Sequence, residues 1–394
     1  MSNSKNNNMF PLFILMLNLF IALLGQGMVI PILPDYLKQF NAAGTAAGYL
    51  VAAFGAAQFI FSPIGGRFSD KYGRRIMILL GLFFTVIADF IFAISHTLML
   101  LYIARLIGGV GIGIMVPSVL AYVADITTKE TRAKGMGYLS AAMNLGMVLG
   151  PGIGGMIAQL GIRIPYFFAA GLGLVASILT FILPETLPLE KRRVADTSKK
   201  QQSIVGELIQ SFHKPYFKHL ILILVMTLGL VGFETVYSLF VENKYGFTSK
   251  DISILITLGA AIGIVIQIWF VEKAVRLFGE YNLIKISLLM TAVALLLMLI
   301  KINFIYLIVV SSLFFTFNSL LRPTVNTLLS NEAGSDEQGF ISGLNTTYMS
   351  MGNIVGPVMA GYLFDKQINL PYIISAIILC CTIFIAGERK KVSK

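Results

Sequence analysis

Twelve apolar runs, each long enough to cross a bilayer as a helix, constrain this chain more than any other feature. A helix needs about 20 apolar residues to span the hydrocarbon core of a membrane. Only 12% of the 394 residues are charged, too few to coat a water-soluble protein of this size. We therefore expect an all-α membrane protein with twelve transmembrane helices. The runs are residues 11–33, 46–68, 76–95, 99–121, 135–158, 164–183, 217–241, 250–272, 283–300, 303–326, 338–363 and 370–387.

The basic residues indicate how these helices are oriented. Most Lys and Arg fall at the termini, in the long central segment and in alternate loops, which accounts for the net charge of +11 without a nucleic-acid partner. The positive-inside rule then predicts a multi-pass protein of the cell membrane with both termini cytoplasmic. The loop 330–338 is acidic and gives this orientation no support. The first run lacks a cleavage signature, so we interpret it as a retained helix.

The two halves of the chain repeat at a constant offset of 206 residues. Gly73 corresponds to Gly279 and Pro117 to Pro323, in equivalent loops and helices. Parallel halves of this kind form two six-helix bundles with a substrate site between them near the middle of the membrane. The predicted domains are an N-terminal bundle at 1–183, a cytoplasmic linker at 184–216 with an amphipathic piece at 204–213, and a C-terminal bundle at 217–394.

The loop between the second and third runs has a pattern that topology alone does not explain. A positive-inside loop accounts for its Arg and Lys residues, but not for the spacing of Gly66, Asp70 and Gly73. The glycines permit a tight turn and close helix approach, and Asp70 is placed to make charge-assisted bonds or to cap a helix. We expect a cytoplasmic gate here, with Asp125 as the partner of Arg74.

The fourth and fifth runs contain further unusual residues. Arg105 lies at membrane depth, where it either snorkels to the surface or handles protons or substrate. In the fifth run, Gly146, Gly150 and Gly154 form a stripe that a neighbouring helix can enter, and Pro151 is expected to kink the helix. Such stripes often serve packing alone, but this segment is richer in glycine than packing requires.

Glu234 stands out because it lies in the middle of an apolar run, where an ionised carboxylate is costly. A carboxyl that accepts either a proton or a cation is the physical basis of antiport. The neighbouring rings of Phe233 and Tyr237 are suited to face a drug cation. The alternative is a protonated, purely structural Glu bonded to a helix neighbour.

The sequence gives little indication of other chemistry. It has no nucleotide-binding GxxxxGK[ST] loop, so we do not expect ATP-driven transport. We see no metal cluster and no persuasive set of nucleophile, base and orienting group, so we expect neither a cofactor nor an enzyme. Cys380 and Cys381 are adjacent on one helix, so we expect no disulfide.

Three segments together resemble a known family. GGRFSDKYGRR, RLIGGVGIG and GMVLGPGIGG look like the loop, arginine and antiporter motifs of the major facilitator superfamily. Nearly the whole chain further resembles the Nor-type quinolone and multidrug efflux pumps of Gram-positive bacteria. The segments that carry this second likeness are VAAFGAAQFIFSPIGG, GFETVYSLF followed by KDISI, and GLNTTYMSMGNIVGP.

The resemblance implies alternating access by two rocking bundles, with proton entry coupled to export of amphipathic, often cationic drugs such as fluoroquinolones and dyes. Glu234 matches the membrane-embedded acid that these pumps use for protonation and cation binding. Asp89 is another intramembrane acid, and with Glu234 and Arg105 it completes our proton-coupling candidates. The residues at or beside positions that line the family's central cavity are Phe54, Gln58, Asn144, Phe233, Tyr237 and Asn353.

One position departs from the pattern of these pumps. They have a second acid three residues before an Arg-Pro pair in the tenth helix, whereas here Ser319 precedes Arg322-Pro323 and Asn318 is its neighbour. A two-carboxylate scheme is therefore in doubt. The expected partners are drugs, protons and lipid, with the protein as a monomer. The main alternative is a symporter or facilitator that imports a polar metabolite such as a sugar.

Overall fold

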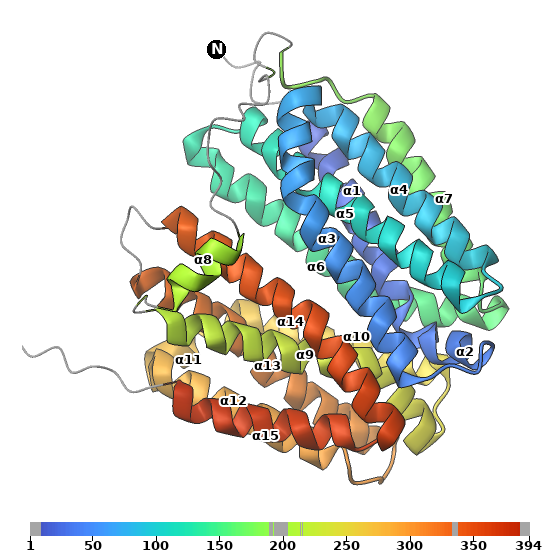
Figure 1. The fold of residues 1–394 in the computed structure, drawn as a ribbon, viewed down its shortest axis with the longest axis vertical. Helices are drawn as coiled ribbons and strands as arrows, with labels where there is room; N and C mark the ends of the chain where they lie inside the picture. The colour runs from blue at the N-terminus through green and yellow to red at the C-terminus, as the bar shows by residue number, and fades with distance from the viewer. Residues whose placement is uncertain are drawn as a thin grey trace, which may run out of the picture. The chain divides into compact units, whose positions relative to one another are not determined.

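The computed structural model describes residues 9–188, 192, 204–212, 214, 216–332 and 338–386, and these form helices joined by short connections (Figure 1). The other residues of the predicted linker 184–216 lie outside this description. The amphipathic piece predicted at 204–213 corresponds to the helix α8. The helices of the first half are α1 (Met9–Met28), η1 (Ile30–Ile32), α2 (Leu33–Lys38), α3 (Gly44–Tyr72), α4 (Arg74–Ile94), α5 (Leu98–Ile126), α6 (Lys129–Ile157), η2 (Ala158–Leu160) and α7 (Ile164–Phe181). Those that follow are α8 (Ile204–Ser211), α9 (Phe217–Tyr245), α10 (Ser249–Trp269), α11 (Val271–Phe278), α12 (Glu280–Leu297), α13 (Phe304–Glu332), α14 (Gln338–Lys366) and α15 (Leu370–Ile385).

The chain divides into two compact units, and the division passes through α3. Unit 1 consists of Met1–Asn41 and Leu50–Lys200, and unit 2 of Ala42–Tyr49 and Gln201–Lys394. Within the described residues, each unit contains the greater part of six long helices. The predicted domain limits at 183 and 217 stay a prediction.

The helix limits follow the predicted repeat. α5 and α13 begin and end 206 residues apart, and so do the first residues of α4 and α12 and of α7 and α15. The turn before α4 and the turn before α12 both use a glycine with positive φ, 109° at Gly73 and 74° at Gly279. This conformation favours glycine because it has no Cβ. The first apolar run is not one continuous helix, because Pro31 and Pro34 lack the backbone N–H that would continue α1.

Helix packing is also repeated inside each unit. In unit 1, α1 packs on α6 and α7, and α4 packs on α5 and α7, as Figure 1 shows. In unit 2 the equivalent pairs α9 with α14 and α15, and α12 with α13 and α15, are in contact. Equivalent helices therefore have equivalent neighbours.

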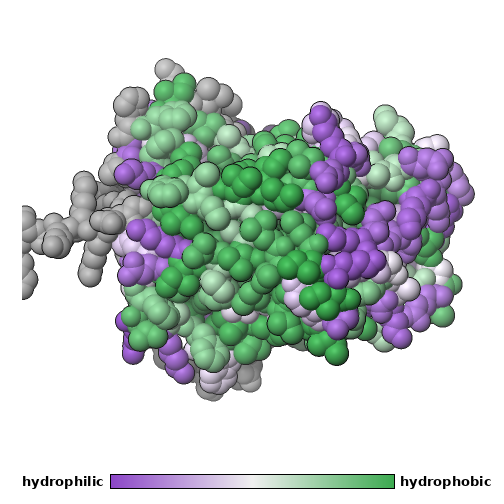
Figure 2. Space-filling view, turned by 90° about the horizontal axis from the view of Figure 1, so that it is seen from below, coloured by the Kyte–Doolittle hydropathy of each residue, from purple (hydrophilic) through white to green (hydrophobic). Residues whose placement is uncertain are grey.

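The outer surface is apolar in the manner of a protein that faces lipid. Along α7, Leu174, Ile178 and Phe181 are 54%, 64% and 62% exposed, while Ala176 and Thr180 on the opposite side are buried. Figure 2 shows one face of the molecule on which apolar side chains cover a wide area and hydrophilic ones gather toward its margins. Exposed stripes of this size are costly in water and favourable in a bilayer.

Ten helices in the described part of the chain are long and apolar enough to cross a membrane. Two more complete the predicted set: α14, which has 29 residues, and α15, a shorter apolar helix of 16 residues. The prediction of an all-α membrane fold with twelve long segments is confirmed in outline.

Candidate functional site

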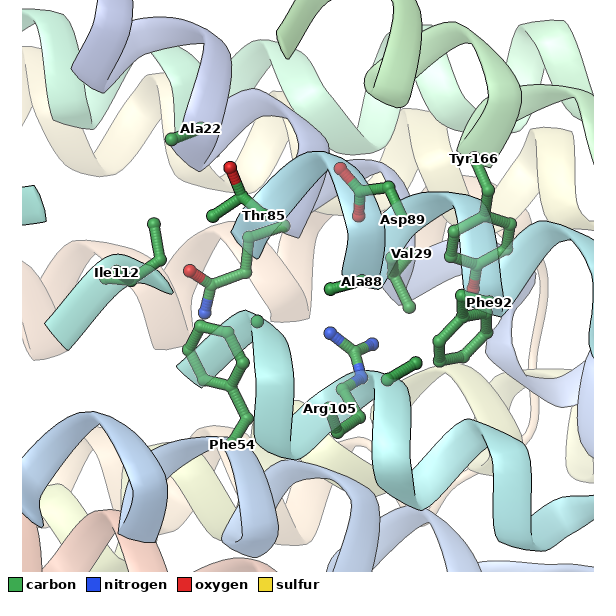
Figure 3. Close-up of a pocket in the computed structure, with 13 residues that line it drawn as sticks. Ala22, Val29, Phe54, Thr85, Ala88, Asp89, Phe92, Arg105, Ile112 and Tyr166 are labelled. Atoms are coloured by element: carbon green, nitrogen blue, oxygen red, sulfur yellow. The ribbon is translucent and has the colours of Figure 1, made fainter. Parts of the chain in front are cut away.

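Unit 1 contains a small pocket of about 30 Å³ between its helices (Figure 3). Its wall combines aromatic rings with two residues of opposite charge, Asp89 and Arg105. The lining residues are Ala22, Gln26, Val29, Phe54, Thr85, Ala88, Asp89, Phe92, Ala104, Arg105, Gly108, Ile112 and Tyr166.

The hairpin of α4 and α5 brings Asp89 and Arg105 to one depth. Asp89 lies five residues before the end of α4 at Ile94, and Arg105 lies seven residues after the start of α5 at Leu98. Because the two helices run in opposite directions from a short turn, such positions lie at similar heights. Both residues were predicted from the sequence as separate proton-coupling candidates, and their similar distance from the turn was a usable signal that they lie together.

Arg105 is held by an aromatic stack. Its guanidinium carbon lies 5.1 Å from the centre of the Phe92 ring, a cation–π arrangement, and Phe92 stacks on Tyr166 with ring centres 4.3 Å apart. The Tyr36 hydroxyl fixes the same region by donating to the Phe92 carbonyl oxygen at 2.7 Å. Arg105 does not snorkel as an isolated surface residue but lines the pocket, and its guanidinium points toward the α4 side in Figure 3.

The two charges in this pocket attract each other without forming a close ion pair. Asp89 and Arg105 are electrostatically coupled, yet no ion pair or hydrogen bond joins them, and neither bonds another described residue. The Arg105 Nε is buried and has no acceptor among the described residues. Both groups therefore have unused bonding capacity toward the pocket.

Glu234 is the corresponding isolated acid of unit 2. It lies near the middle of α9, a 29-residue helix, and is partly buried. Arg322 of α13 is the charged residue to which it couples, and the described part of the chain offers its carboxyl no hydrogen bond. The alternative of a purely structural Glu requires a hydrogen bond to a helix neighbour, and the described part of the chain contains no such bond.

The aromatic neighbours of Glu234 do not lie as we expected. Phe233 and Tyr237 are only 3% and 1% exposed. Phe233 packs on Phe314 with ring centres 4.0 Å apart, and the Tyr237 hydroxyl is hydrogen-bonded to Ser311 Oγ at 2.7 Å. Neither ring is exposed in this structure, and their contact with a drug stays a prediction. Both rings lie on the buried side of α9.

Ser319 is not in a position to replace the missing acid chemically. Its hydroxyl donates to the Thr316 carbonyl oxygen at 2.8 Å, within its own helix α13. Ser319 carries no carboxyl, and its hydroxyl proton is engaged within its own helix. The second acid of the unit 2 pattern thus has no counterpart at this position.

The other predicted cavity residues are distributed over both units. Phe54 lines the unit 1 pocket, and Gln58 lies one turn further along α3, partly buried. Asn144 of α6 is exposed. Asn353 of α14 in unit 2 is partly buried. Of the six residues, the structure brings Phe54 together with Asp89 and Arg105.

The loop between α3 and α4 forms the ion-pair cluster that the sequence predicted. Arg74 donates through Nη1 to Asp70 at 2.5 Å and to Ser69 Oγ at 3.2 Å, and through Nε to Asp125 at 3.2 Å. Gly73 provides the turn, with a φ of 109°. The predicted pairing of Arg74 with Asp125 is confirmed, whereas the gating role of this cluster stays a prediction.

Glu185 also belongs to this cluster, although it was not predicted from the sequence. Its carboxylate accepts the backbone N–H groups of Arg74 at 2.8 Å and Arg75 at 3.1 Å, and so caps α4 in place of Asp70. The signal was an acid directly after the sixth run, close to the predicted cytoplasmic side.

The close approach of a neighbouring helix requires a glycine at Gly65, not at Gly66. A Cβ added at Gly65 would lie 2.6 Å from the Ile114 Cα, whereas one added at Gly66 would lie 3.9 Å from its nearest neighbour.

The glycine stripe of α6 packs against the backbone of α1. A Cβ added at Gly146, Gly150 or Gly154 would lie 2.4–2.6 Å from a carbonyl oxygen of α1. Pro151 lies inside the same helix and faces Gly27, where a Cβ would come within 3.0 Å. The predicted entry of a neighbouring helix is confirmed, and α1 is that helix.

Metal and thiol chemistry has little support in the described part of the chain. No group of three or more His, Cys, Asp or Glu residues there is arranged to hold a metal ion. Cys380 and Cys381 are free.

The chain matches the family model of the Major Facilitator Superfamily over residues 15–357 and 270–390. It is 40% identical to Multidrug resistance protein 2 of Bacillus subtilis (strain 168) over 380 residues, 96% of this chain and 95% of that protein. It is 38% identical to Quinolone resistance protein NorA of Staphylococcus aureus (strain MSSA476) over 384 residues, 97% of each chain.

Solved structures show the same fold at low sequence identity. The nucleoside transporter NupG is 13% identical, with a TM-score of 0.76 over 96% of this chain and 99% of that one. A bacterial homolog of the human lysosomal transporter Spinster, in an inward-facing and occupied conformation, is 12% identical, with a TM-score of 0.74 over 96% of this chain and 95% of that one. These likenesses concern the fold alone.

Proposed function

Since this chain belongs to the major facilitator superfamily, we propose that it exports amphipathic, often cationic drugs, such as fluoroquinolones and dyes, in exchange for protons. It is a transporter, not an enzyme, and a multi-pass membrane protein. Its similarity over nearly the full length to proteins named for multidrug and quinolone resistance supports drug efflux. Proton coupling and the residues that achieve it are our inference.

The observation that carries the proposal is the isolated carboxyl of Glu234. An acid in an apolar helix is costly and is retained where it has a function. In the described part of the chain Glu234 has no hydrogen bond, so a proton or a drug cation has no internal competitor beyond the more distant attraction of Arg322. Binding of one then excludes the other, which couples their movements in opposite directions.

Phe233 and Tyr237 support this site from within. Their buried packing against Phe314 and Ser311 holds the inner face of α9, and so fixes where Glu234 lies on the helix. We propose that direct drug contact of these rings belongs to another conformation of the transport cycle. Gln58, Asn144 and Asn353 are proposed as further drug contacts.

Asp89 and Arg105 are proposed as a second pair that handles protons. Their charges face one pocket and are not satisfied by each other at bonding distance. Protonation of Asp89 would free Arg105 from the attraction of the carboxylate. The pair can therefore change its net charge with each proton taken up or released.

Two motifs are assigned to movement. We propose that Gly66, Asp70, Gly73, Arg74 and Asp125 form a cytoplasmic gate that breaks and reforms its ion pairs during transport. The close contact of the α6 stripe with α1 supports a pivot on which one helix moves against the other without side chains between them. We place both termini in the cytoplasm, and retain the two-bundle division at 183 and 217.

Efflux measurements test the proposal. Cells that express the protein should export ethidium while energised, and an ionophore that collapses the proton gradient should stop export. Glu234→Gln should lower the export rate at least tenfold, because it removes the charge but keeps the shape. Glu272→Gln, at a side chain 78% exposed on α11, is the matched control and should not change it. Export that continues without the gradient would refute proton coupling.

The alternative function, import of a polar metabolite such as a sugar, predicts different behaviour. It requires uptake of a defined nutrient and indifference to lipophilic cations. The aromatic walls and isolated charges of the unit 1 pocket favour an amphipathic ligand over a sugar, which needs many paired polar groups.

A further inference from the structure

The second repeat does not copy the end of α3, which leads into the proposed gate. Residues 271–278 are equivalent to 65–72 of α3, yet in unit 2 they form the separate helix α11. Val271 takes the place of Gly65, where a Cβ would lie 2.6 Å from the Ile114 Cα of α5. A residue with a side chain does not permit so close an approach to the equivalent helix. The regular helix accordingly ends at Trp269, before Phe270, and α11 is available for a different contact.

The residue pattern of α11 is typical of a helix that lies along a membrane surface. Its charged residues Glu272, Lys273 and Arg276 project from one side, and its apolar residues from the other. The apolar residues Val271, Ala274 and Val275 are half-buried where α11 packs on its neighbours α10, α12 and α13. An amphipathic helix with basic residues on its polar side lies in the plane of the interface between lipid and water.

The apolar surface beside α11 continues the side of α10 that faces lipid. Leu258, Val265 and Trp269 lie on one side of α10 and are 43%, 52% and 67% exposed. Leu277 of α11 adds to this surface and is 76% exposed. Trp269 is the single Trp of the chain, and Trp is enriched where the apolar core of a membrane meets its headgroups. The end of α10 therefore marks the level of the lipid headgroups.

Lys273 lies at this level without a carboxylate partner in the described part of the chain. Its ammonium is 5.6 Å from the centre of the Phe270 ring, which is itself half exposed. Arg276, in contrast, is paired with Glu272. A lysine in this position keeps its stem on apolar surface while its charge reaches toward the headgroups.

We propose that the patch of Trp269, Phe270, Lys273 and Leu277 binds an anionic phospholipid, with Lys273 at the phosphate of its headgroup. The inference goes beyond drug export, because it concerns the membrane around the transporter and not its cargo. Lipid is the occupant because the apolar part of the patch is continuous with the side of α10 that faces the bilayer. An anionic headgroup is preferred over a zwitterionic one because the latter carries its own cation, which competes with Lys273 for the phosphate.

The fluorescence of Trp269 measures this site directly, because the chain has no other Trp. The full-length protein is placed in vesicles of equal parts phosphatidylglycerol and phosphatidylcholine, in which one lipid or the other carries bromine on its acyl chains and quenches Trp on contact. The anionic lipid should be preferred about fivefold in the wild type, the factor that one basic residue near an anionic surface contributes. Lys273→Gln should bring this ratio to about one.

Two further variants separate the site from a general effect of charge. Lys273→Arg keeps the charge and should retain the preference. Lys250→Gln removes a charge at the opposite end of α10, which has 21 residues and is therefore about 30 Å long. It should leave the ratio unchanged, because that distance exceeds the screening length of about 8–10 Å at ordinary salt. Both lysines are exposed, and thermal unfolding confirms that each variant is folded.

Three results would overturn the proposal. The first is equal quenching by the two brominated lipids in the wild type, and the second is a preference that Lys273→Gln leaves unchanged. The third is quenching by neither lipid, because Trp269 would then lie in water or beneath a second copy of the protein.

Discussion

Helices α5 and α13 cover equivalent stretches of the two repeats, 206 residues apart, yet they differ in what they carry. At the position of Arg105 in α5, α13 has Ser311, which is fully buried and hydrogen-bonded to Tyr237. The same contrast holds between α1 and α9. The residue equivalent to Glu234 in the first repeat is Met28, an apolar residue that is 1% exposed. The repeat preserves the backbone frame, while the charges that can do transport chemistry differ between its copies.

The largest expected effect tests the shared frame. Gly150→Val in α6 and Gly356→Val in α14 should each destabilise the fold by about 3 kcal/mol or more, because overpacking cannot be relieved where a backbone is the neighbour. The added Cβ would lie 2.6 Å from a carbonyl oxygen in both cases, that of Leu24 or Leu228. Thermal unfolding of the purified protein measures the loss.

Two further glycines of the same repeat serve as matched controls. A Cβ at Gly137 or at Gly343 meets nothing within 4 Å. Replacement by Ala should leave stability equal or raise it by about 0.5–1 kcal/mol, since Ala is the better helix former. If only one of the two equivalent substitutions, at Gly150 or at Gly356, lowered stability, the two repeats would not share the same helix packing. The same conclusion would follow if only one of the two control substitutions lowered it.

The next effect tests the difference between the copies. Arg74→Ala should lower stability by about 1–3 kcal/mol and slow export, because it removes the donor from Asp70, Ser69 and Asp125. Its counterpart in the second repeat is Glu280, and Glu280→Ala should change export little. Unfolding and ethidium efflux of both variants provide the measurement. Equal slowing by both would contradict the assignment of gating chemistry to the first copy.

The number and the repeated arrangement of the helices could be predicted from the sequence, because the lengths of the apolar runs and the 206-residue offset can be read from it directly. It also predicted the contact of Arg74 with Asp125, since both lie at the predicted cytoplasmic ends of their helices. It did not predict which way a residue faces around the helix axis. Packing decides that, and it buried Phe233 and Tyr237 and directed Asp89 and Arg105 to one pocket.

A smaller effect is expected at the cap of α4. Glu185→Gln should cost about 1 kcal/mol, because a neutral amide interacts less well than a carboxylate with the two N–H groups at a helix start. Thermal unfolding should show this loss, with Glu272→Gln as a control whose loss should be smaller, because the ion pair of Glu272 with Arg276 is exposed to solvent. A loss that is equal in the two variants would mean that the cap contributes nothing specific.

The most direct test of the division between the copies is proton movement in proteoliposomes. With a pH-sensitive dye inside, an imposed ethidium gradient should drive protons in the opposite direction through the wild type and through Met28→Leu. Glu234→Gln should abolish this counterflow, although the two altered positions are equivalent in the repeat. Counterflow that persists undiminished in Glu234→Gln would contradict the claim that the second copy carries the coupling carboxyl.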